Sequence, residues 1–521
     1  MNIESSVRVL ALAFLPGFAL MATEASAVER PLTLDEAIAL ALEKNETIWI
    51  ERKSLASAEA GVQGAKGAYD TVVDLDGGWR RATEPVNSTF SGAPEGALAP
   101  TVETGDANAA VHQLLPTGGE VTVHAGAARS TTDGTFDPLS PSYSTRLGIE
   151  LRQPLLRNRG TDAARLGVRV ATAERNRSAA ALRREIAETV AAVERAYWQL
   201  AAARRAVEVR AEAVRLAEEQ LSLTQIRIEQ GVTPQEEAAQ PRAELERRRG
   251  ELLDSQEVLA RAENALKLLI LGDADVDLWA DQFSPTDDVR VDVLSVDIVA
   301  AMERALASRP ELEAASAAIE RRRAETDFAQ DGVWPELDAV AAYDRFGLSG
   351  SQNTAVAVGS IDPANEGEWG RAFEMLGEGH YDDLRVGLEF SMPIRNRTAR
   401  AAAETARNAE EQATAELARA RKTVRSEVLD AAAALQAAGQ RIEAARAGRE
   451  AAEVQLSSEQ ERYAVGLSTN FLVLTRQNDL SQARLAEISA QTDYRTARTE
   501  MARVTGSLLE ERRIDVDAPT P

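Results

Sequence analysis

The sequence contains no cysteine and only three histidines. Without cysteine the chain can form no disulfide bond, and it lacks the residue on which a bacterial lipoprotein carries its lipid. His112, His124 and His380 are isolated, and no two of them have the i, i+4 spacing of metal ligands on a helix. We therefore expect neither a metal site nor a bound cofactor.

Sequence signatures of catalysis are missing as well. The chain has no glycine loop followed by Lys and Ser or Thr, and no Gly-x-Ser-x-Gly nucleophile turn. Its formal net charge of −24 argues against nucleic acid, whose phosphates require clustered cations. Carboxylates are abundant, but on charged helices they are solvated or paired with arginine. We expect no enzyme and no nucleic-acid partner.

Long apolar runs are absent after the N-terminus. The one at the start, from Val9 to Met21, is followed by the small residues Ala25-Ser26-Ala27. It is shorter than the ~20 residues that span a bilayer, which favours a signal peptide over a membrane anchor. We predict cleavage after Ala27, so residues 1–27 would be a signal peptide and the mature chain would be exported and unlipidated.

What the chain does contain is a repeat of itself. The segment from Arg227 to Thr233 recurs 235 residues later as Arg462 to Ser468, with a gap-free match of Val193, Leu200 and Leu221 to Val428, Leu435 and Leu456. Self-similarity over this length indicates duplication. We expect a first structural repeat at 28–272, a linker at 273–292, a second repeat at 293–512 and a disordered C-terminal tail at 513–521.

Each repeat contains one very long helical segment with a seven-residue stripe. The stripe consists of Ile186, Val193, Leu200, Val207, Val214, Leu221 and Ile228 in one half, and of Val428, Leu435, Ile442, Leu456 and Tyr463, interrupted by Arg449, in the other. The partner positions of the stripe within each heptad are mostly alanine, so close-packed, left-handed coiled coils are predicted. The expected long helices, 163–230 and 397–464, would each measure about 100 Å. Shorter helices are expected at 32–66, 234–271, 297–330 and 470–510, which together suggest a helical cylinder.

Other segments alternate with a period of two, apolar then charged. They are 73–80, 143–152, 336–344 and 383–390. This pattern is typical of strands with lipid on one side and water on the other, although a soluble sheet on a core alternates too. The stretches 83–107 and 347–380, rich in Gly, Pro, Ser and Asn, are expected to be loops. A further candidate hairpin, 109–115 and 121–127, either joins this sheet or decorates it.

Four strands cannot close a barrel. An open sheet edge in lipid would leave backbone groups without hydrogen-bond partners. We therefore expect other copies of the chain to complete the barrel.

In these features, the chain resembles the TolC-like outer-membrane efflux proteins. The resemblance is carried by Leu32 to Ala37, Gln153 to Leu156, Arg309 to Leu312, and Arg462-Tyr463 with Gly466 followed by Val473-Leu474, in this order within the duplicated plan. It implies a mainly α fold with a transmembrane β-barrel portion: a homotrimer with a barrel of about 12 strands in outer-membrane lipid, continued by a coiled-coil α-barrel in the periplasm. It also implies a passive exit duct for tripartite efflux or type I secretion, working with a periplasmic adaptor (membrane fusion) protein and an inner-membrane transporter of the RND or ABC class.

The resemblance also assigns roles to residues at the ends of the long helices. It makes the two turns adaptor-contact tips: Gly231, Val232, Thr233, Gly466, Leu467 and Ser468. The alternative is that the glycines only end the helices, since glycine adopts left-handed angles freely. The periplasmic entrance would be shaped by Asn470, Phe471, Leu472, Thr475 and Asp479. Where family members often have aspartates, this chain has Leu472 and Thr475, so we expect packing and neutral contacts to hold the entrance closed.

Two further hypotheses follow from the sequence. The acidic excess favours cations if it lines the water-filled passage. The competing function is a periplasmic coiled-coil structural or adaptor protein, which would share the heptads and signal peptide but would have no use for amphipathic strands. The cargo, the pump class and the gating of the entrance are left open by the sequence.

Overall fold

A computed structural model describes residues 29–85, 87, 92–94, 97–232, 234–288, 296–356 and 361–515. The predicted signal peptide and residues 516–521 of the predicted tail lie outside this range. The chain forms two compact units, and each takes segments from both halves of the sequence. The helical unit comprises Met1–Asn45, Ala192–Asp292 and Ala438–Thr496, and the sheet unit comprises Glu46–Ala191, Val293–Ala437 and Ala497–Pro521.

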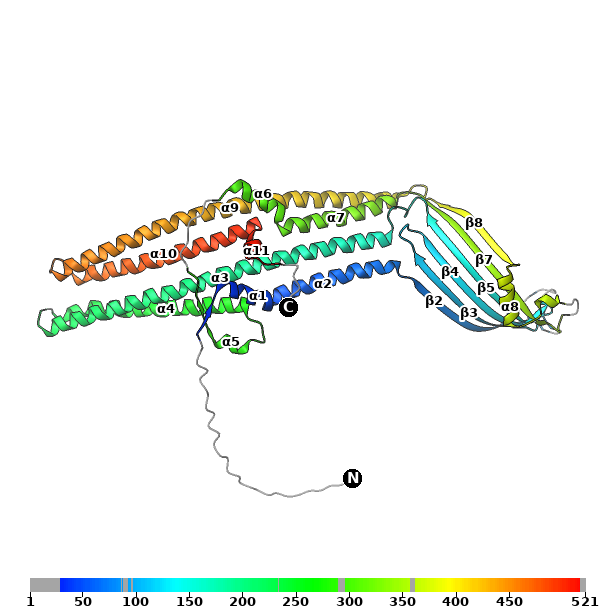
Figure 1. Ribbon diagram of the computed structural model, residues 1–521, viewed down its shortest axis with the longest axis horizontal. Coiled ribbons are helices and arrows are strands. Elements are labelled where there is room, and N and C mark those ends of the chain that lie inside the picture. The colour runs from blue at the N-terminus through cyan, green and yellow to red at the C-terminus, as the bar shows by residue number, and fades with distance from the viewer. Residues whose placement is uncertain are drawn as a thin grey trace, which may run out of the picture. The chain divides into compact units, whose positions relative to one another are not determined.

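The two long helices have the bounds that the heptads predicted. They are α3 (Ala163–Glu229) and α9 (Arg397–Ala464), and each contributes to both units. Their seven-residue stripes are buried or half-buried, with Val193, Leu200 and Val428 inaccessible to solvent. The interruption at Arg449 is explained by pairing, because its Nε donates to Glu487 at 2.6 Å on α10 (Asn470–Thr505). The arginine therefore replaces an apolar contact by an ion pair between antiparallel neighbours (Figure 1).

Two helices that were expected to be continuous are broken in two. The first gives β1 (Glu29–Leu32), α1 (Leu34–Lys44) and α2 (Glu46–Lys66). Thr33 begins α1 with a capping box in which Glu36 bonds back to the Thr33 backbone. The other gives α6 (Ile298–Ser308) and α7 (Pro310–Asp331), because the proline disfavours helical angles at the residue before it. The remaining helices are α4 (Ala239–Ile270), α5 (Val276–Ala280), α8 (Trp369–Glu378), α11 (Leu508–Glu511) and the 3₁₀ turns Gly67–Tyr69, Gln235–Ala238 and Pro363–Asn365.

A small parallel ladder fastens the start of the described chain in the helical unit. Strand β1 pairs with β6 (Gln282–Pro285), in a segment expected to be only a linker. The Tyr197 hydroxyl of α3 donates to the Leu32 carbonyl at 3.0 Å, and burial raises the pKa of this hydroxyl well above its usual value. The tyrosine therefore stays neutral and can hold the ladder against α3.

The large sheet has six strands, where the alternating segments predicted four. The antiparallel order is β2-β3-β4-β5-β7-β8, and Figure 1 shows the strands side by side. Their bounds are Val72–Thr83, Thr101–Leu114, Glu120–Thr132, Leu139–Pro154, Glu336–Gln352 and Asp382–Ser391. The candidate hairpin joins the sheet as β3 and β4, and is longer than predicted. Two expected loops are therefore corrected: 101–107 belongs to β3, and 347–380 contains the end of β7 and helix α8.

The register gives this sheet one apolar and one polar face. The apolar side chains that share a face across the six strands include Val73, Leu75, Trp79, Ala107, Ala109, Val111, Val121, Val123, Ala125, Ala127, Leu147, Ile149, Leu151, Leu337, Ala339, Ala341, Leu384, Val386, Leu388 and Phe390. Most of its large side chains are exposed, with Leu75 and Val386 at 77% and 75%. Within the described residues, α8 is the helix that packs on this face, near the loop ends, and the rest of these side chains have no core over them.

Helix α8 caps part of the apolar face. The Thr145 hydroxyl donates to the Ala372 carbonyl at 3.0 Å, and the rings of Tyr143 and Trp369 meet edge to face at 5.0 Å. Gly347 must lack a side chain here, since a Cβ would lie 2.0 Å from the Ala372 oxygen. Among the described helices, none is apolar over a length that could cross a membrane.

Candidate functional site

The two tip turns have the same backbone geometry. After α3, the Gly231 and Val232 amides donate to the Ile228 and Arg227 carbonyls, with Gly231 at a φ of 71°. After α9, Gly466 and Leu467 repeat the pattern onto Tyr463 and Arg462, with Gly466 at a φ of 78°. Both are Schellman caps, in which glycine takes the left-handed position. The glycines therefore do end the helices, as one of the two interpretations held.

The same turns also display apolar side chains. Val232 and Leu467, the residues after the glycines, are 73% and 71% exposed. Thr233 lies outside the described residues. The Ser468 hydroxyl hydrogen-bonds to Glu459, which ties the second turn to its own helix. A rigid turn with an outward apolar residue is suited to contact with a partner, so capping does not exclude a role in binding.

The predicted entrance residues occupy the first turns of α10. The Asn470 side chain accepts a hydrogen bond from Gln220 of α3. The Thr475 hydroxyl donates a hydrogen bond to the Phe471 carbonyl at 2.8 Å. Asp479 pairs with Arg476 at 3.0 Å. Phe471 and Leu472 are exposed, while the next two residues, Val473 and Leu474, are buried. Phe471 and Leu472 therefore lie on the exposed side of this helix and are accessible for contact with another chain.

Sequence reasoning missed the buried arginine that joins these elements. Arg248 of α4 is 2% exposed and donates to the Ala213 carbonyl at 2.9 Å and to Leu474 and Gln477 of α10 at 3.3 Å. It also pairs with Glu244. Its neighbours in the run 247–249 are surface arginines, so no sequence signal distinguished it. Within the helical unit, this guanidinium fastens α10 to both helices of the first half.

A second link of this kind joins the two tips. The Arg227 guanidinium donates to the Tyr463 hydroxyl at 2.7 Å and lies 4.8 Å from the centre of its ring. Cation–π and hydrogen-bond contacts thus act together on one pair. Arg227 and Tyr463 lie in the two copies of the segment that recurs in the sequence, at non-equivalent positions, so the two copies contact each other.

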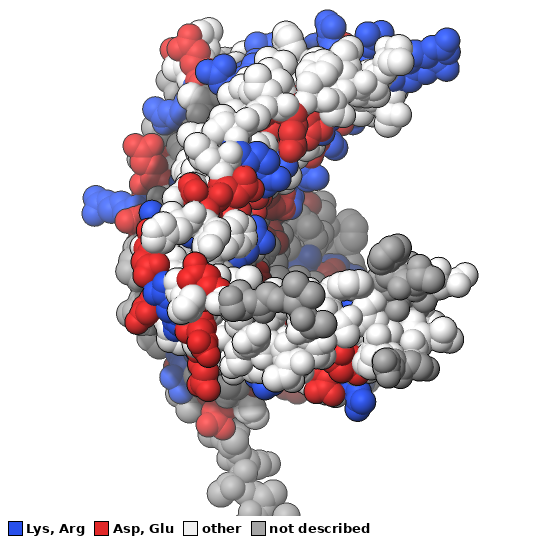
Figure 2. All heavy atoms as spheres, turned by 90° about the vertical axis from the view of Figure 1, so that its right-hand side faces the viewer, with Lys and Arg blue, Asp and Glu red and all other residues white. Residues whose placement is uncertain are grey.

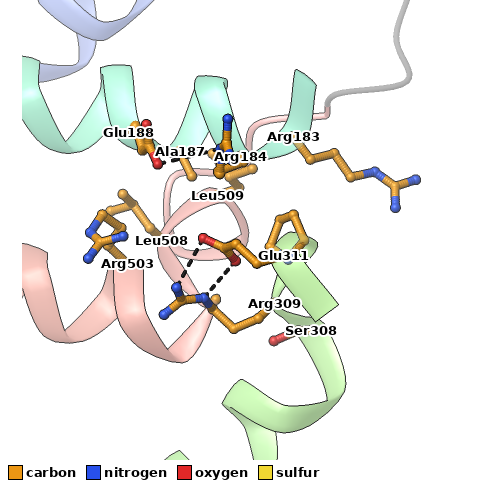
Figure 3. Close-up of a pocket in the computed structure, with 12 residues that line it drawn as sticks. Arg183, Arg184, Ala187, Glu188, Ser308, Arg309, Glu311, Arg503, Leu508 and Leu509 are labelled. Carbon is orange, nitrogen blue, oxygen red and sulfur yellow. Dashed lines mark hydrogen bonds and ion pairs between the residues drawn. The ribbon is translucent and has the colours of Figure 1, made fainter. Parts of the chain in front are cut away.

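In the sheet unit, Arg309 organises the junction between α6 and α7 (Figure 3). It is 4% exposed and holds Glu311 through two hydrogen bonds of 2.8 and 3.0 Å. It also reaches Glu427 on α9 at 2.8 Å and the Val504 carbonyl on α10 at 3.2 Å. A cavity of about 90 Å³ adjoins this node, lined also by Arg183, Arg184 and Glu188 of α3.

The electrostatics of this node favour the ion pair. Burial alone would raise the pKa of Glu311, but the hydrogen bonds and charge of Arg309 outweigh it, so the pKa of this carboxyl lies below its usual value. The motif Arg309 to Leu312, which carried the family resemblance, is therefore a structural junction.

The polar face of the large sheet carries a network of paired charges. Asp344 on β7 accepts from His124 on β4 at 2.6 Å and from Arg146 on β5 at 2.9 Å. Arg152 on β5 joins Asp338 and Glu389 on the next two strands at 3.1 and 2.8 Å. No group of side chains in the described part of the chain is arranged to hold a metal ion. Figure 2, in which the right-hand side of Figure 1 faces the viewer, shows acidic and basic side chains interspersed.

Comparison with known families identifies this architecture. Residues 103–272 and 301–507, more than half of the chain, match the family described as "Outer membrane efflux protein". The chain belongs to the outer membrane efflux protein family. It is therefore an outer-membrane exit duct of tripartite efflux systems, a passive channel, and the periplasmic adaptor alternative is set aside.

Three solved structures with the same fold are distant in sequence. The outer-membrane channel OprN has a TM-score of 0.63 at 15% identity, with 91% of this chain and 90% of that one covered. CmeC of Campylobacter jejuni gives 0.61 at 16%, covering 91% and 86%. VceC of Vibrio cholerae gives 0.60 at 16%, covering 91% and 96%. No curated protein matches the chain. At such identities the likeness of this efflux protein to them is one of fold.

Proposed function

We propose that this efflux protein works as a homotrimer whose strands form one closed barrel in the outer membrane, with the helices continuing as a channel through the periplasm. The observation that carries the proposal is the exposed apolar face, which extends over all six strands and ends at two open edges, β2 and β8. Each strand has 10 to 17 residues. A tilted strand needs about 9–11 to span a bilayer.

The opposite face is compatible with water. Several of its charges are paired across strands, and open edges in lipid would be costly unless copies of the chain pair there. Outer-membrane extracts in mild detergent test the proposal. We expect the mass of three chains and stepwise conductance in a planar bilayer. A monomer without conductance would refute it.

We further propose that the tips bind a periplasmic adaptor, which connects the channel to an inner-membrane transporter of the RND or ABC class. The exposed Val232 and Leu467 support this, because both stand on rigid caps. In the double variant Val232→Asp with Leu467→Asp, we expect loss of cross-linking to the adaptor encoded nearest to this gene.

The matched control separates contact from capping. Gly231→Ala with Gly466→Ala strains both caps, because alanine disfavours positive φ, but keeps the exposed apolar side chains. We expect these variants to retain adaptor cross-linking. If the alanine variants lose it and the aspartate variants do not, the turns serve only as helix ends.

At the entrance, we propose that packing of Leu472 and neutral contacts of Thr475 keep the resting channel narrow, in place of an acidic ring. Leu472 is exposed in the single chain, so copies of α10 can meet there. Leu472→Ala with Thr475→Ala should raise the resting conductance of reconstituted channels, whereas unchanged conductance would disprove the idea.

The sequence organisation also remains a proposal that can be tested directly. We propose that residues 1–27 are removed on export and that 28–272 and 293–512, joined by 273–292 and followed by a disordered tail at 513–521, are duplicated repeats. Mass spectrometry of the outer-membrane form should place its first residue at Val28. A first residue at Met1 would show that the segment is retained.

A further inference from the structure

Hairpin β3–β4 is built into the large sheet along its whole length. Strand β3 pairs with β2 without a break from Val72↔His112 to Thr83↔Thr101. Strand β4 pairs with β5 from Glu120↔Arg152 to Ser130↔Ser142. The hairpin therefore takes part in three of the five ladders of this sheet, and removing it would separate β2 from β5.

The turn between the two strands is fixed to the base of the sheet. The Thr117 hydroxyl donates to the Gln153 side chain at 2.9 Å. Gly118 has a φ of 83°, and a Cβ there would lie 2.5 Å from the Asn158 carbonyl oxygen. The turn thus packs closely on the connection from β5 to α3, as expected for a turn between two strands inside a sheet.

The two faces of the sheet continue across the hairpin. Ala109, Val111, Val123 and Ala125 are in register with Leu75, Val73, Ile149 and Leu147 on the apolar side. On the polar side, Asn108 donates to Asp76 on β2 at 2.8 Å. His124 reaches past β5 to Asp344 on β7, and it does so over Gly148, where a Cβ would lie 2.0 Å from the carboxylate.

We infer that the hairpin is part of the membrane wall, so that the closed barrel contains eighteen strands, six from each of three chains, and not about twelve. This inference rests on the proposed trimer. The diameter of a barrel grows roughly in proportion to strand number, so the wall is about 1.5-fold wider than a twelve-stranded one. At eighteen strands the interior is an aqueous channel. The partner at each edge is a second copy of the chain, with its β8 beside β2.

Neighbouring alanines on opposite faces provide a sharp test, because the chain has no cysteine of its own. Ala109→Cys and Ala127→Cys place a thiol on the apolar face, while Ala110→Cys and Ala128→Cys place one on the polar face. The full-length trimer, reconstituted in phospholipid vesicles, is treated with a charged, membrane-impermeant thiol reagent. We expect modification at positions 110 and 128, and at least tenfold slower modification at 109 and 127.

A reference pair outside the hairpin makes the outcomes distinguishable. Val386→Cys lies on the apolar face of β8, and Gly387→Cys lies on the polar face in open space. If reactivity differs between positions 386 and 387 but is equal at all four hairpin positions, the hairpin is not part of the membrane wall. The eighteen-stranded barrel is then overturned, while the proposed trimeric barrel stands. Equal reactivity of the reference pair, or a particle without the mass of three chains, would overturn the proposed barrel itself. Alternation at all three pairs in a trimer supports the inference.

Discussion

Gly148 shows how the lack of a side chain can hold strands together. It lies on the polar face of β5, directly beneath the hydrogen bond from His124 to Asp344. A Cβ at this position would meet both partners, at 2.4 Å from the His124 ring and 2.0 Å from the carboxylate. The bridge between β4 and β7 therefore exists only because the residue between them is glycine.

We predict that Gly148→Ala lowers the melting temperature of the protein in detergent. The methyl group would displace Asp344 from His124, and loss of a charge-assisted hydrogen bond costs about 1.5–3 kcal/mol. Gly387→Ala is the matched control, since it lies on the same face and a Cβ there meets nothing within 4 Å. If both variants melt like the wild type, the bridge contributes nothing to stability.

Arg309 offers a second test at the residue scale. We predict that Arg309→Met destabilises the protein by about 3–5 kcal/mol, because Glu311 and Glu427 lose a buried partner. Thermal unfolding, followed by circular dichroism, measures the change. Arg323→Met is the control, because that arginine makes an exposed pair with Glu320, and such pairs are worth about 0–1 kcal/mol. Equal effects of the two variants would contradict the junction role.

The lowered pKa of Glu311 has a pH dependence of definite sign. A carboxyl whose pKa is lower in the folded state stabilises the fold above its unfolded pKa, and this stabilisation is lost as pH falls through the folded pKa. We therefore predict that Glu311→Gln lowers the melting temperature at pH 7, and that its difference from the wild type shrinks in acid. A difference that stays constant from pH 7 to pH 3 would contradict this.

At the scale of elements, a buried charge from another helix contributes to holding α10. Arg248 of α4 donates to two residues of α10, Leu474 and Gln477. Both lie among the proposed entrance residues, which run from Asn470 to Asp479. This guanidinium therefore helps to hold α10 beside α3 and α4.

We predict that Arg248→Met raises the resting conductance of reconstituted channels severalfold, because α10 loses its attachment to α4. Single-channel recording at low voltage measures it. Arg249→Met is the adjacent control, since Arg249 makes only exposed pairs with Glu218 and Glu246. Conductance that rises equally in both variants would trace the effect to surface charge.

The elements also mark how far the sequence could predict this fold. The ends of α3 and α9 matched the predicted bounds to within one residue, because a seven-residue stripe closed by glycine is a strong signal. The hairpin was underestimated because its apolar positions are mainly Ala107, Ala109, Ala125 and Ala127, whose alternation with Gly and Asn is faint. The role of Arg248 was invisible, since burial of one arginine among three depends on tertiary packing alone.

At the scale of the whole molecule, the acidic residues outnumber the arginines on the polar face of the large sheet. On the polar face of the large sheet the acids are Asp74, Asp76, Asp106, Glu120, Glu150, Glu336, Asp338, Asp344, Asp383 and Glu389, and the arginines are Arg80, Arg146, Arg152 and Arg385. Several acids are paired with these arginines, and the rest remain as a surplus of one sign. A water-filled wall of this composition attracts cations.

We predict a moderate cation preference of the reconstituted channel. Reversal potentials under a gradient of potassium chloride measure it, and the preference should weaken at high ionic strength, where the Debye length falls to about 3 Å. Equal permeation of chloride and potassium at low salt would refute the prediction.

The short ladder between β1 and β6 has a consequence for the order in which the protein can fold. Its two strands are separated by some 250 residues, from Glu29 to Gln282. If the chain emerges N-terminus first, β1 waits without a partner until more than half of the polypeptide has followed. Closing so long a loop is entropically slow, so the ladder forms late in folding. A chain arrested before residue 282 would keep its first strand unpaired, and this exposed end would be a natural target for periplasmic proteases.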